Sequence, residues 1–257
     1  MEFLSTIGRI FLLFVAAIGR VTLFTWWALI SVFVPPWYGK QTVRSMVEIG
    51  YNSLPVIGLT AIFTGAVLAL QSYSGFSRFS AESSIPIVVV LSITRELGPV
   101  LAGLMVAGRI GASYAAEIGT MRVTEQIDAL TTLSTDPYKY LVFPRLLAGL
   151  LMLPFLVLIA DIIGVFGGYL VSIHELGFNP TTYLKNTVQY LERRDVISGL
   201  VKASAFGFIV TLMGCYHGFH SRGGAQGVGS ATTMAVVSAS IMILLANYTL
   251  TSLFFAK

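Results

Sequence analysis

Residues 86–118 read PIVVVLSITRELGPVLAGLMVAGRIGASYAAEI, and this stretch decides the class of fold. A membrane-spanning helix needs about 20 predominantly apolar residues, and the stretch is longer than that. At about 1.5 Å per residue the helix would run to roughly 50 Å, against a hydrocarbon core of roughly 30 Å. We therefore expect it to tilt, kink or project from the bilayer, with Pro99 as the source of a kink.

The composition of the whole chain is that of a membrane protein. Hydrophobic residues make up 55% of the sequence and charged residues 11%, which is too little charge to solvate a soluble protein of this length. No clustered basic face is visible, so we expect no nucleic-acid partner. The one cysteine, Cys215, excludes an intramolecular disulfide.

Four further apolar stretches predict an all-α integral membrane fold with five spans, in a single domain of residues 1–257. Polar segments separate the spans, and one of these is a glycine-rich loop at 218–230. The four further stretches are 53–73, 142–172, 197–217 and about 231–255.

The first 50 residues are predicted to form an interfacial and elbow region. Residues 1–34 are apolar but carry Arg9 and Arg20, and Arg20 favours a helix lying along or dipping into the membrane interface. The alternative is a true span from about 10 to 34. Residues 37–50 are polar and amphipathic.

The placement of lysine and arginine predicts the orientation. With the polar loop 119–141 in the cytoplasm, nine basic residues fall on the cytoplasmic side and five on the far side, which the positive-inside rule favours. The cytoplasmic set is Arg9, Arg20, Lys40, Arg44, Arg109, Arg122, Lys139, Arg145 and Arg222; the far set is Arg78, Lys185, Arg193, Arg194 and Lys257.

Charged residues inside the spans are candidate functional groups, because charge at membrane depth is costly. Arg95 and Glu96 are adjacent, so their side chains point about 100° apart and at least one needs another partner, such as Lys202. Arg95 and Glu96 could line a path for lipid, or they could form structural ion pairs that hold neighbouring helices together. Lys202 could instead snorkel outward. Asp161 is either a proton or substrate site or the donor or acceptor of a structural hydrogen bond.

The polar loop is the candidate contact with a soluble protein. Thr124 is placed to cap a short helix in which Ile127, Leu130 and Leu133 share a face. An amphipathic helix of this kind suits a groove on a partner, and an ordinary interfacial loop is the alternative.

The sequence lacks the residue patterns of several kinds of catalytic and binding site. There is no phosphate-binding loop of the G-x-x-x-x-G-K-[ST] type, so energy from ATP would come from a partner chain. No serine-hydrolase elbow is present. His217 and His220 have a spacing that zinc can use, but the remaining ligands are missing, so we expect no metal site.

Three ordered runs resemble the MlaE/YrbE family of permeases. They are Arg95 to Val100 (RELGPV), Ala107 to Gly111 (AGRIG) and Ala116 to Leu130 (AEIGTMRVTEQIDAL). Asp136-Pro137, Pro144-Arg145 and Gly227 to Thr233 (GVGSATT) fit the same pattern. The resemblance covers nearly the whole chain and is weakest over residues 1–40.

The resemblance implies a homodimeric ABC-transporter permease in a bacterial inner membrane, with an N-terminal interfacial helix and five spans. Two cytoplasmic ATPase subunits would bind ATP and magnesium, so this chain would need no cofactor and would not be an enzyme. A periplasmic MCE-domain protein, often a hexameric ring, would be a further partner, and a small accessory cytoplasmic subunit is also compatible. The cargo would be glycerophospholipid moved between inner and outer membranes.

The resemblance also implies roles for residues. The segment 117–133, with Glu117, Arg122, Glu125 and Asp128, would dock on the ATPase. The lipid cavity between two copies would be lined by Leu68, Gln71, Arg95, Glu96, Leu97 and Lys202. Asn247 matches a position that is acidic in some relatives, which puts a charge role there in doubt.

Two other classes of function compete with this reading. An ion-gradient-driven secondary transporter could use Asp161 as its proton site, but such proteins often show internal repeats and none is visible. A membrane-embedded lipid enzyme would need a paired catalytic constellation, and the sequence shows none.

Overall fold

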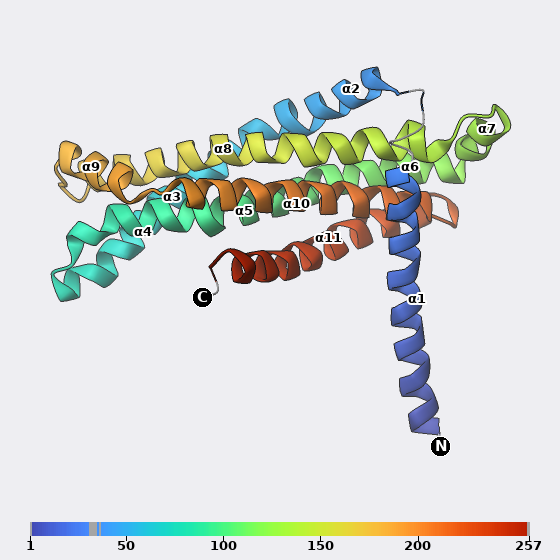
Figure 1. Ribbon diagram of the computed structural model, residues 1–257, viewed down its shortest axis with the longest axis horizontal. Helices are drawn as coiled ribbons and strands as arrows, with labels where there is room; N and C mark the ends of the chain where they lie inside the picture. Colours follow the sequence, from blue (N-terminus) through green and yellow to red (C-terminus); the bar gives the residue numbers. More distant parts are fainter. Residues whose placement is uncertain (1, 31–34, 36, 256–257) are drawn as a thin grey trace.

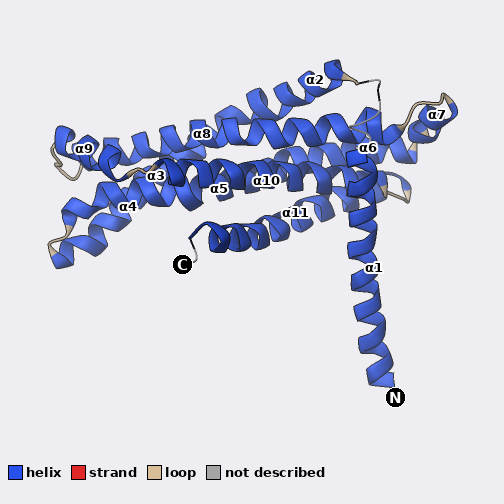
Figure 2. Cartoon of the chain, viewed as in Figure 1, coloured by secondary structure: helices blue, strands red, loops and turns tan. Residues whose placement is uncertain are grey.

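The computed structural model describes residues 2–30, 35 and 37–255, and every regular element in these ranges is a helix (Figures 1 and 2). Residues 31–34 and 36, at the end of the predicted interfacial segment, lie outside the described ranges. The α-helices are α1 (Glu2–Ile30), α2 (Gly39–Gly50), α3 (Leu54–Phe76), α4 (Ile85–Ser92), α5 (Gly98–Val106), α6 (Ala112–Val123), α7 (Gln126–Thr132), α8 (Phe143–His174), α9 (Pro180–Tyr190), α10 (Arg193–Phe219) and α11 (Gly224–Phe255).

Short tighter or wider turns connect several of these helices. The 3-10 turns are η2 (Tyr51–Ser53), η3 (Ser77–Phe79) and η4 (Glu82–Ser84), and the π turns are η5 (Ile93–Leu97), η6 (Ala107–Gly111) and η7 (Tyr138–Val142).

Within the described ranges, six helical segments are long and apolar enough to cross a membrane: Phe11–Ile30, Gly39–Phe79, Glu82–Val123, Tyr138–His174, Arg193–Phe219 and Gly224–Phe255. The chain is therefore a multi-pass membrane protein. Large apolar side chains such as Leu59, Ile162 and Leu245 are more than half exposed, as suits helices whose solvent is lipid.

The predicted glycine-rich loop at 218–230 is much shorter than expected. Helix α10 continues to Phe219 and α11 already begins at Gly224. The chain reverses direction in a few residues because Gly223 and Gly224 take positive φ angles of 90° and 69°, which other residues rarely adopt.

The stretch 86–118 lies in a longer helical segment that contains two π turns. The segment runs through α4, η5, α5, η6 and α6 without leaving helical geometry. The turn η5 ends at Leu97, two residues before Pro99, the residue expected to cause a kink. A π turn widens a helix locally and often marks a functional position.

Glycines let the central helices pack backbone against backbone. Helices α3 and α8 meet where a Cβ on Gly65 would lie 1.8 Å from the Gly164 carbonyl oxygen. Helices α8 and α10 meet where a Cβ on Gly207 would lie 2.1 Å from the Gly149 carbonyl oxygen. The hydrophobic effect does not drive helices together in lipid, so close backbone packing of this kind contributes to helix association instead.

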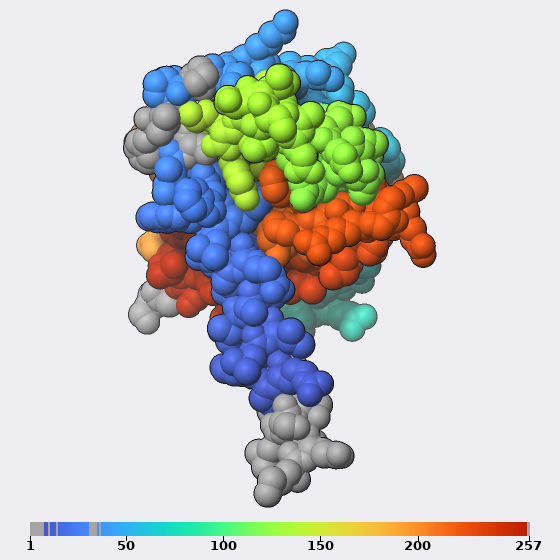
Figure 3. Space-filling model, turned by 90° about the vertical axis from the view of Figure 1, so that its right-hand side faces the viewer, coloured from blue at the N-terminus to red at the C-terminus, as the bar shows by residue number. Residues whose placement is uncertain are grey.

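Helix α1 runs across the direction of the long helices and projects from the bundle (Figures 1 and 3). It touches the bundle near its own C-terminal end, where the Phe24 ring lies 5.4 Å from Tyr138 and 5.5 Å from Tyr216. Phe24 and Ala28 are buried there, whereas Leu12, Trp26 and Trp27 are exposed.

Replacing Gly207 by alanine should destabilise the bundle, because its methyl group would overlap the backbone of α8. We expect a loss of about 1–3 kcal/mol, typical of overpacking, and a lower midpoint of thermal unfolding in detergent. Gly75→Ala is the matched control, since nothing lies within 4 Å of a Cβ there. Equal midpoints for the two variants would show that the α8–α10 contact is not tight.

Candidate functional site

The site lies next to Pro99, which has no backbone N–H and so cannot donate a helix hydrogen bond. In the π turn η5 the Gly98 N–H donates to the carbonyl of Ile93, and Pro99, one residue later, has no N–H to give. The carbonyl oxygen of Arg95, four residues before Pro99, instead accepts a hydrogen bond from Lys202 Nζ at 2.9 Å. A side chain of α10 therefore satisfies a backbone group that the helix leaves open.

Glu96 gathers three donors from two other helices. Lys202 Nζ lies 2.6 Å from Glu96 Oε1, and Thr251 Oγ1 donates to the same oxygen at 2.9 Å. Asn247 Nδ2 donates to Glu96 Oε2 at 2.8 Å. Because Lys202 is fully buried, it does not snorkel, and its ammonium group is neutralised by Glu96 inside the bundle.

Arg95 has a different partner from Glu96, as expected for adjacent residues whose side chains point about 100° apart. Its Nε donates to Asp195 Oδ1 at 2.8 Å, and the Arg95 side chain remains 34% exposed. The second oxygen of Asp195 accepts from the backbone N–H of Glu192, in a capping box that begins α10. The Arg95 guanidinium also lies 4.8 Å from the centre of the Phe255 ring.

An apolar recess lies beside this network. Leu68 and Gln71 of α3 and Leu97 of η5 line it, together with Phe63, Thr64 and Val67, and its volume is about 390 Å³. Three of the six residues that the sequence predicts to line a lipid cavity, Leu68, Gln71 and Leu97, are thus brought together, whereas Arg95, Glu96 and Lys202 do not line this recess. All six lining residues come from α3 and η5, so the recess is open on its other sides.

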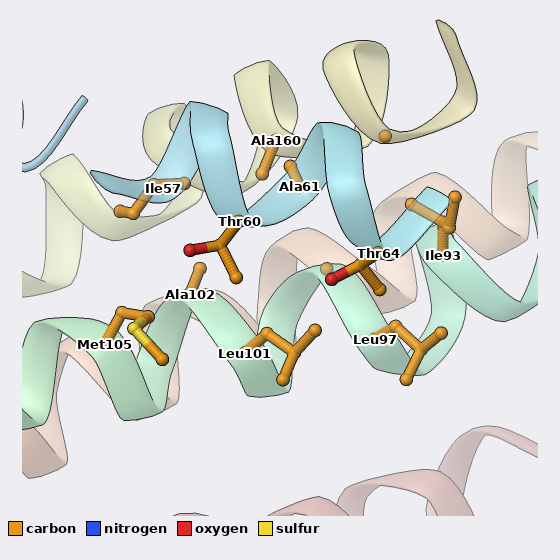
Figure 4. A pocket seen from close by; sticks show the side chains of 12 residues that line it. Ile57, Thr60, Ala61, Thr64, Ile93, Leu97, Leu101, Ala102, Met105 and Ala160 are labelled. Atoms are coloured by element: carbon orange, nitrogen blue, oxygen red, sulfur yellow. The ribbon is translucent and has the colours of Figure 1, made fainter. Parts of the chain in front are cut away.

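A narrow apolar pocket continues from the recess between α3 and α5 (Figure 4). Thr64 and Leu97 line both, and the pocket extends past Leu101 to Met105. Its volume of about 20 Å³ has room for about one water molecule, so it is a seam rather than a binding chamber.

Asp161 lies in the middle of α8 and faces the end of the turn η5. It is buried, its Oδ1 has no hydrogen-bond partner among the described residues, and it faces the backbone of Gly98. A structural hydrogen bond from a described neighbour is therefore not what holds Asp161 in place.

The predicted coupling segment 117–133 forms the end of α6 and the short helix α7 (Figure 3). Arg122 Nη1 donates to Asp128 Oδ1 at 2.7 Å. Glu125 is exposed and takes a positive φ of 60° at the turn between the helices. Glu117 lies further back and pairs with Arg145 at 2.8 Å.

Two local expectations for this segment are wrong. Thr124 does not cap α7, because its hydroxyl donates back to the carbonyl of Thr120 and Glu125 occupies the cap position. Ile127 is buried and Leu130 half-buried, but Leu133 is 75% exposed because α7 ends at Thr132.

The histidines near the end of α10 have partners within the bundle. His217 Nε2 lies 3.0 Å from Ser238 Oγ, and His220 Nδ1 lies 2.8 Å from the carbonyl oxygen of Tyr216. The described part of the chain holds no cluster of three or more side chains suited to a metal ion.

A family model described as "Permease MlaE" matches residues 42–253, which is most of the chain and includes the whole network. The chain belongs to the MlaE permease family. The resemblance seen in residues 95–130 is confirmed, and the chain is a permease subunit of the ABC-transporter class.

Named relatives of this MlaE permease share nearly its full length. A "Probable ABC transporter permease protein" of Rickettsia felis is 61% identical over 98% of this chain and 97% of its own. The "Intermembrane phospholipid transport system permease protein MlaE" of Haemophilus influenzae is 34% identical over 99% of this chain and 98% of its own. The Arabidopsis thaliana chloroplast protein "TRIGALACTOSYLDIACYLGLYCEROL 1" is 38% identical over 84% of this chain and 62% of its own.

Two members of the network were missed from the sequence. Asp195 stood in a stretch predicted only as polar, although its position three residues after Glu192 is the spacing of a capping box. Thr251 follows Asn247 by four residues and so shares its helix face, which was the available signal.

Removing the Lys202 ammonium should leave Glu96 and the Arg95 carbonyl without their shared donor. We expect Lys202→Met to destabilise the fold by at most about 3–5 kcal/mol, as for one half of a buried pair. Adding Glu96→Gln should recover part of this loss, which a double-mutant cycle of unfolding free energies in detergent would measure. Strictly additive effects would mean that the two side chains do not interact.

Proposed function

We propose that this MlaE permease moves glycerophospholipid between the inner and outer bacterial membranes, powered by a separate cytoplasmic ATPase. The observations that carry the proposal are an apolar recess lined by α3 and Leu97, and a fixed, partly exposed guanidinium on Arg95, two residues earlier in the same turn η5. Acyl chains gain about 0.8 kcal/mol for each CH₂ group removed from water, and a guanidinium suits a phosphate. The phospholipid named for the Haemophilus influenzae relative is of this chemical class.

The two basic residues of the network, Arg95 and Lys202, have different roles in this proposal. Arg95 keeps about a third of its side chain exposed and is the group that meets the lipid phosphate. Lys202 is fully buried, so it acts on cargo only by holding Glu96 and the turn η5 in position. This revises the expectation that both residues line the lipid cavity.

A second copy of the chain completes the cavity in this proposal. The recess is lined only by α3 and η5, and large apolar side chains are exposed on α3 (Leu59, Phe63) and on α11 (Leu244, Leu245). Two such faces brought together would enclose the recess and bury these side chains. Helix α1, which crosses the bundle direction, would lie along the interface of the inner membrane.

Partner proteins supply what this chain lacks. The ATPase subunits bind ATP and magnesium and dock on the end of α6 and on α7, which lie at one end of the bundle (Figure 1). This segment carries the charged residues Arg122, Glu125 and Asp128. The expected orientation places this end in the cytoplasm. A periplasmic MCE-domain protein receives lipid at the opposite end, and an accessory cytoplasmic subunit is compatible with this arrangement.

One observation favours a second candidate function. Asp161 is a buried carboxyl group in mid-helix without a described hydrogen-bond partner, which is the setting of a proton site in an ion-driven transporter. The two candidates are separated by reconstituting the complex in liposomes and supplying either ATP or a proton gradient. Transport driven by the gradient alone would favour the second.

Reversing the charge at Arg95 should weaken lipid binding without dissolving the complex. Arg95→Glu places a carboxylate against Asp195 and against the lipid phosphate, so we expect several-fold less co-purified phospholipid and slower transfer. Arg78→Glu, an exposed basic residue outside the recess, is the control. Unchanged lipid content in Arg95→Glu would remove this residue from the lipid site.

Charge reversal on α6–α7 should loosen the ATPase while the bundle stays folded. Arg122 and Asp128 are surface-exposed, so their ion pair contributes only about 0.2–1 kcal/mol to stability. We expect Arg122→Glu or Asp128→Lys to reduce ATPase recovery in a pull-down, with Glu175→Lys at the far end of α8 as the control. Full retention of the ATPase by both variants would place the docking surface elsewhere.

A further inference from the structure

A polar cleft is lined by residues of α2, α6 and α8, at the end of the bundle that we assign to the cytoplasm. Its volume is about 630 Å³, and it shares no lining residue with the apolar recess or with the seam between α3 and α5. Gln41, Arg44 and Glu48 line it from α2, and Glu117 and Arg145 line it from α6 and α8. Two positive and two negative side chains therefore face one space.

Arg145 and Glu117 form an ion pair with each other, whereas Arg44 and Glu48 do not. Arg145 is buried, donates to Glu117 and to the carbonyl of Leu141, and is stacked 5.0 Å from the Tyr114 ring centre. Its Nε has no acceptor among the described residues. Arg44 and Glu48, by contrast, form no ion pair with any described residue, although each lines the cleft.

Helix α2 presents this open pair next to an apolar stripe. Arg44 and Glu48 are four residues apart and share one face of the helix. Val43, Val47 and Tyr51 have the same spacing on a neighbouring face and are 59%, 54% and 73% exposed. The third face, with Ser45 and Ile49, is buried against the bundle. A polar surface and an apolar surface thus run side by side along α2, an arrangement that suits the polar head group and the apolar acyl chains of a lipid.

We propose that this cleft binds the head group of a zwitterionic phospholipid from the cytoplasmic leaflet. The Arg44 guanidinium takes the phosphate, and the Glu48 carboxylate takes the ammonium. The acyl chains lie over Val43, Val47 and Tyr51 toward α3. The complementary pair of free charges favours phosphatidylethanolamine over an anionic lipid, because an anionic lipid leaves Glu48 without a cation.

The site is distinct from the recess beside Arg95 and does not depend on transport. It places a lipid at the opposite end of the bundle from the proposed MCE-domain partner. A phosphate in solution shares part of this chemistry but lacks both the ammonium and the acyl chains, so it would not use Glu48 or the apolar stripe.

The test is photo-crosslinking of the full-length chain in nanodiscs of phosphatidylethanolamine and phosphatidylglycerol. A phosphatidylethanolamine probe carries a diazirine near the start of one acyl chain, and labelled peptides are located by mass spectrometry. We expect labelling of α2 and η2 that falls about tenfold in Arg44→Gln, which corresponds to about 1.4 kcal/mol and to one lost charge-assisted hydrogen bond. Lys40→Gln, an exposed basic residue on α2 outside the cleft, should leave labelling unchanged.

A second variant tests the identity of the head group. Glu48→Gln should abolish the advantage of unlabelled phosphatidylethanolamine over phosphatidylglycerol as a competitor. Labelling of α2 that is equal in Arg44→Gln and Lys40→Gln would overturn the proposal, and so would complete competition by inorganic phosphate. Labelling of α3 and η5 in the same samples reports on the separate recess, so failure of one site is distinguished from failure of the other.

Discussion

The buried ammonium group of Lys202 is the contact on which the site depends. Pro99 cannot donate a backbone hydrogen bond, and Lys202 supplies the donor that the Arg95 carbonyl needs. The same nitrogen pairs with Glu96, which in turn binds Asn247 and Thr251 of α11. One side chain thereby joins three helical segments at a depth where an unpaired charge would be strongly unfavourable.

This arrangement fixes Arg95 in the turn η5, two residues before Leu97, which lines the apolar recess. Asp195 fixes the guanidinium from one side and the Phe255 ring lies against it, so its position does not depend on cargo. The glycine contacts between α3, α8 and α10 hold the supporting helices close enough for these short polar contacts. A prepositioned positive charge beside apolar surface is what an amphiphilic cargo requires, since neither feature alone discriminates lipid from other solutes.

The spans were predictable because their signal is local, and the site was predictable only in part. Long apolar runs are visible without knowing any contact, and the need of Arg95 and Glu96 for separate partners followed from helix geometry alone. The pairing of Arg95 with Asp195, a hundred residues away, depends on how α10 packs against η5. The burial of Lys202 and the cleft beside α2 are likewise products of packing, as is the absence of a cap at Thr124.

Cryo-electron microscopy of the permease with its ATPase in lipid nanodiscs, at side-chain resolution, tests the central claim most directly. We expect two copies to face each other across α3 and α11, with acyl-chain density against Leu68 and Leu97 and a head group at Arg95. Lys202 should be buried against Glu96 and away from that density. Copies that meet through another face, or lipid density in contact with Lys202 and remote from Arg95, would contradict it.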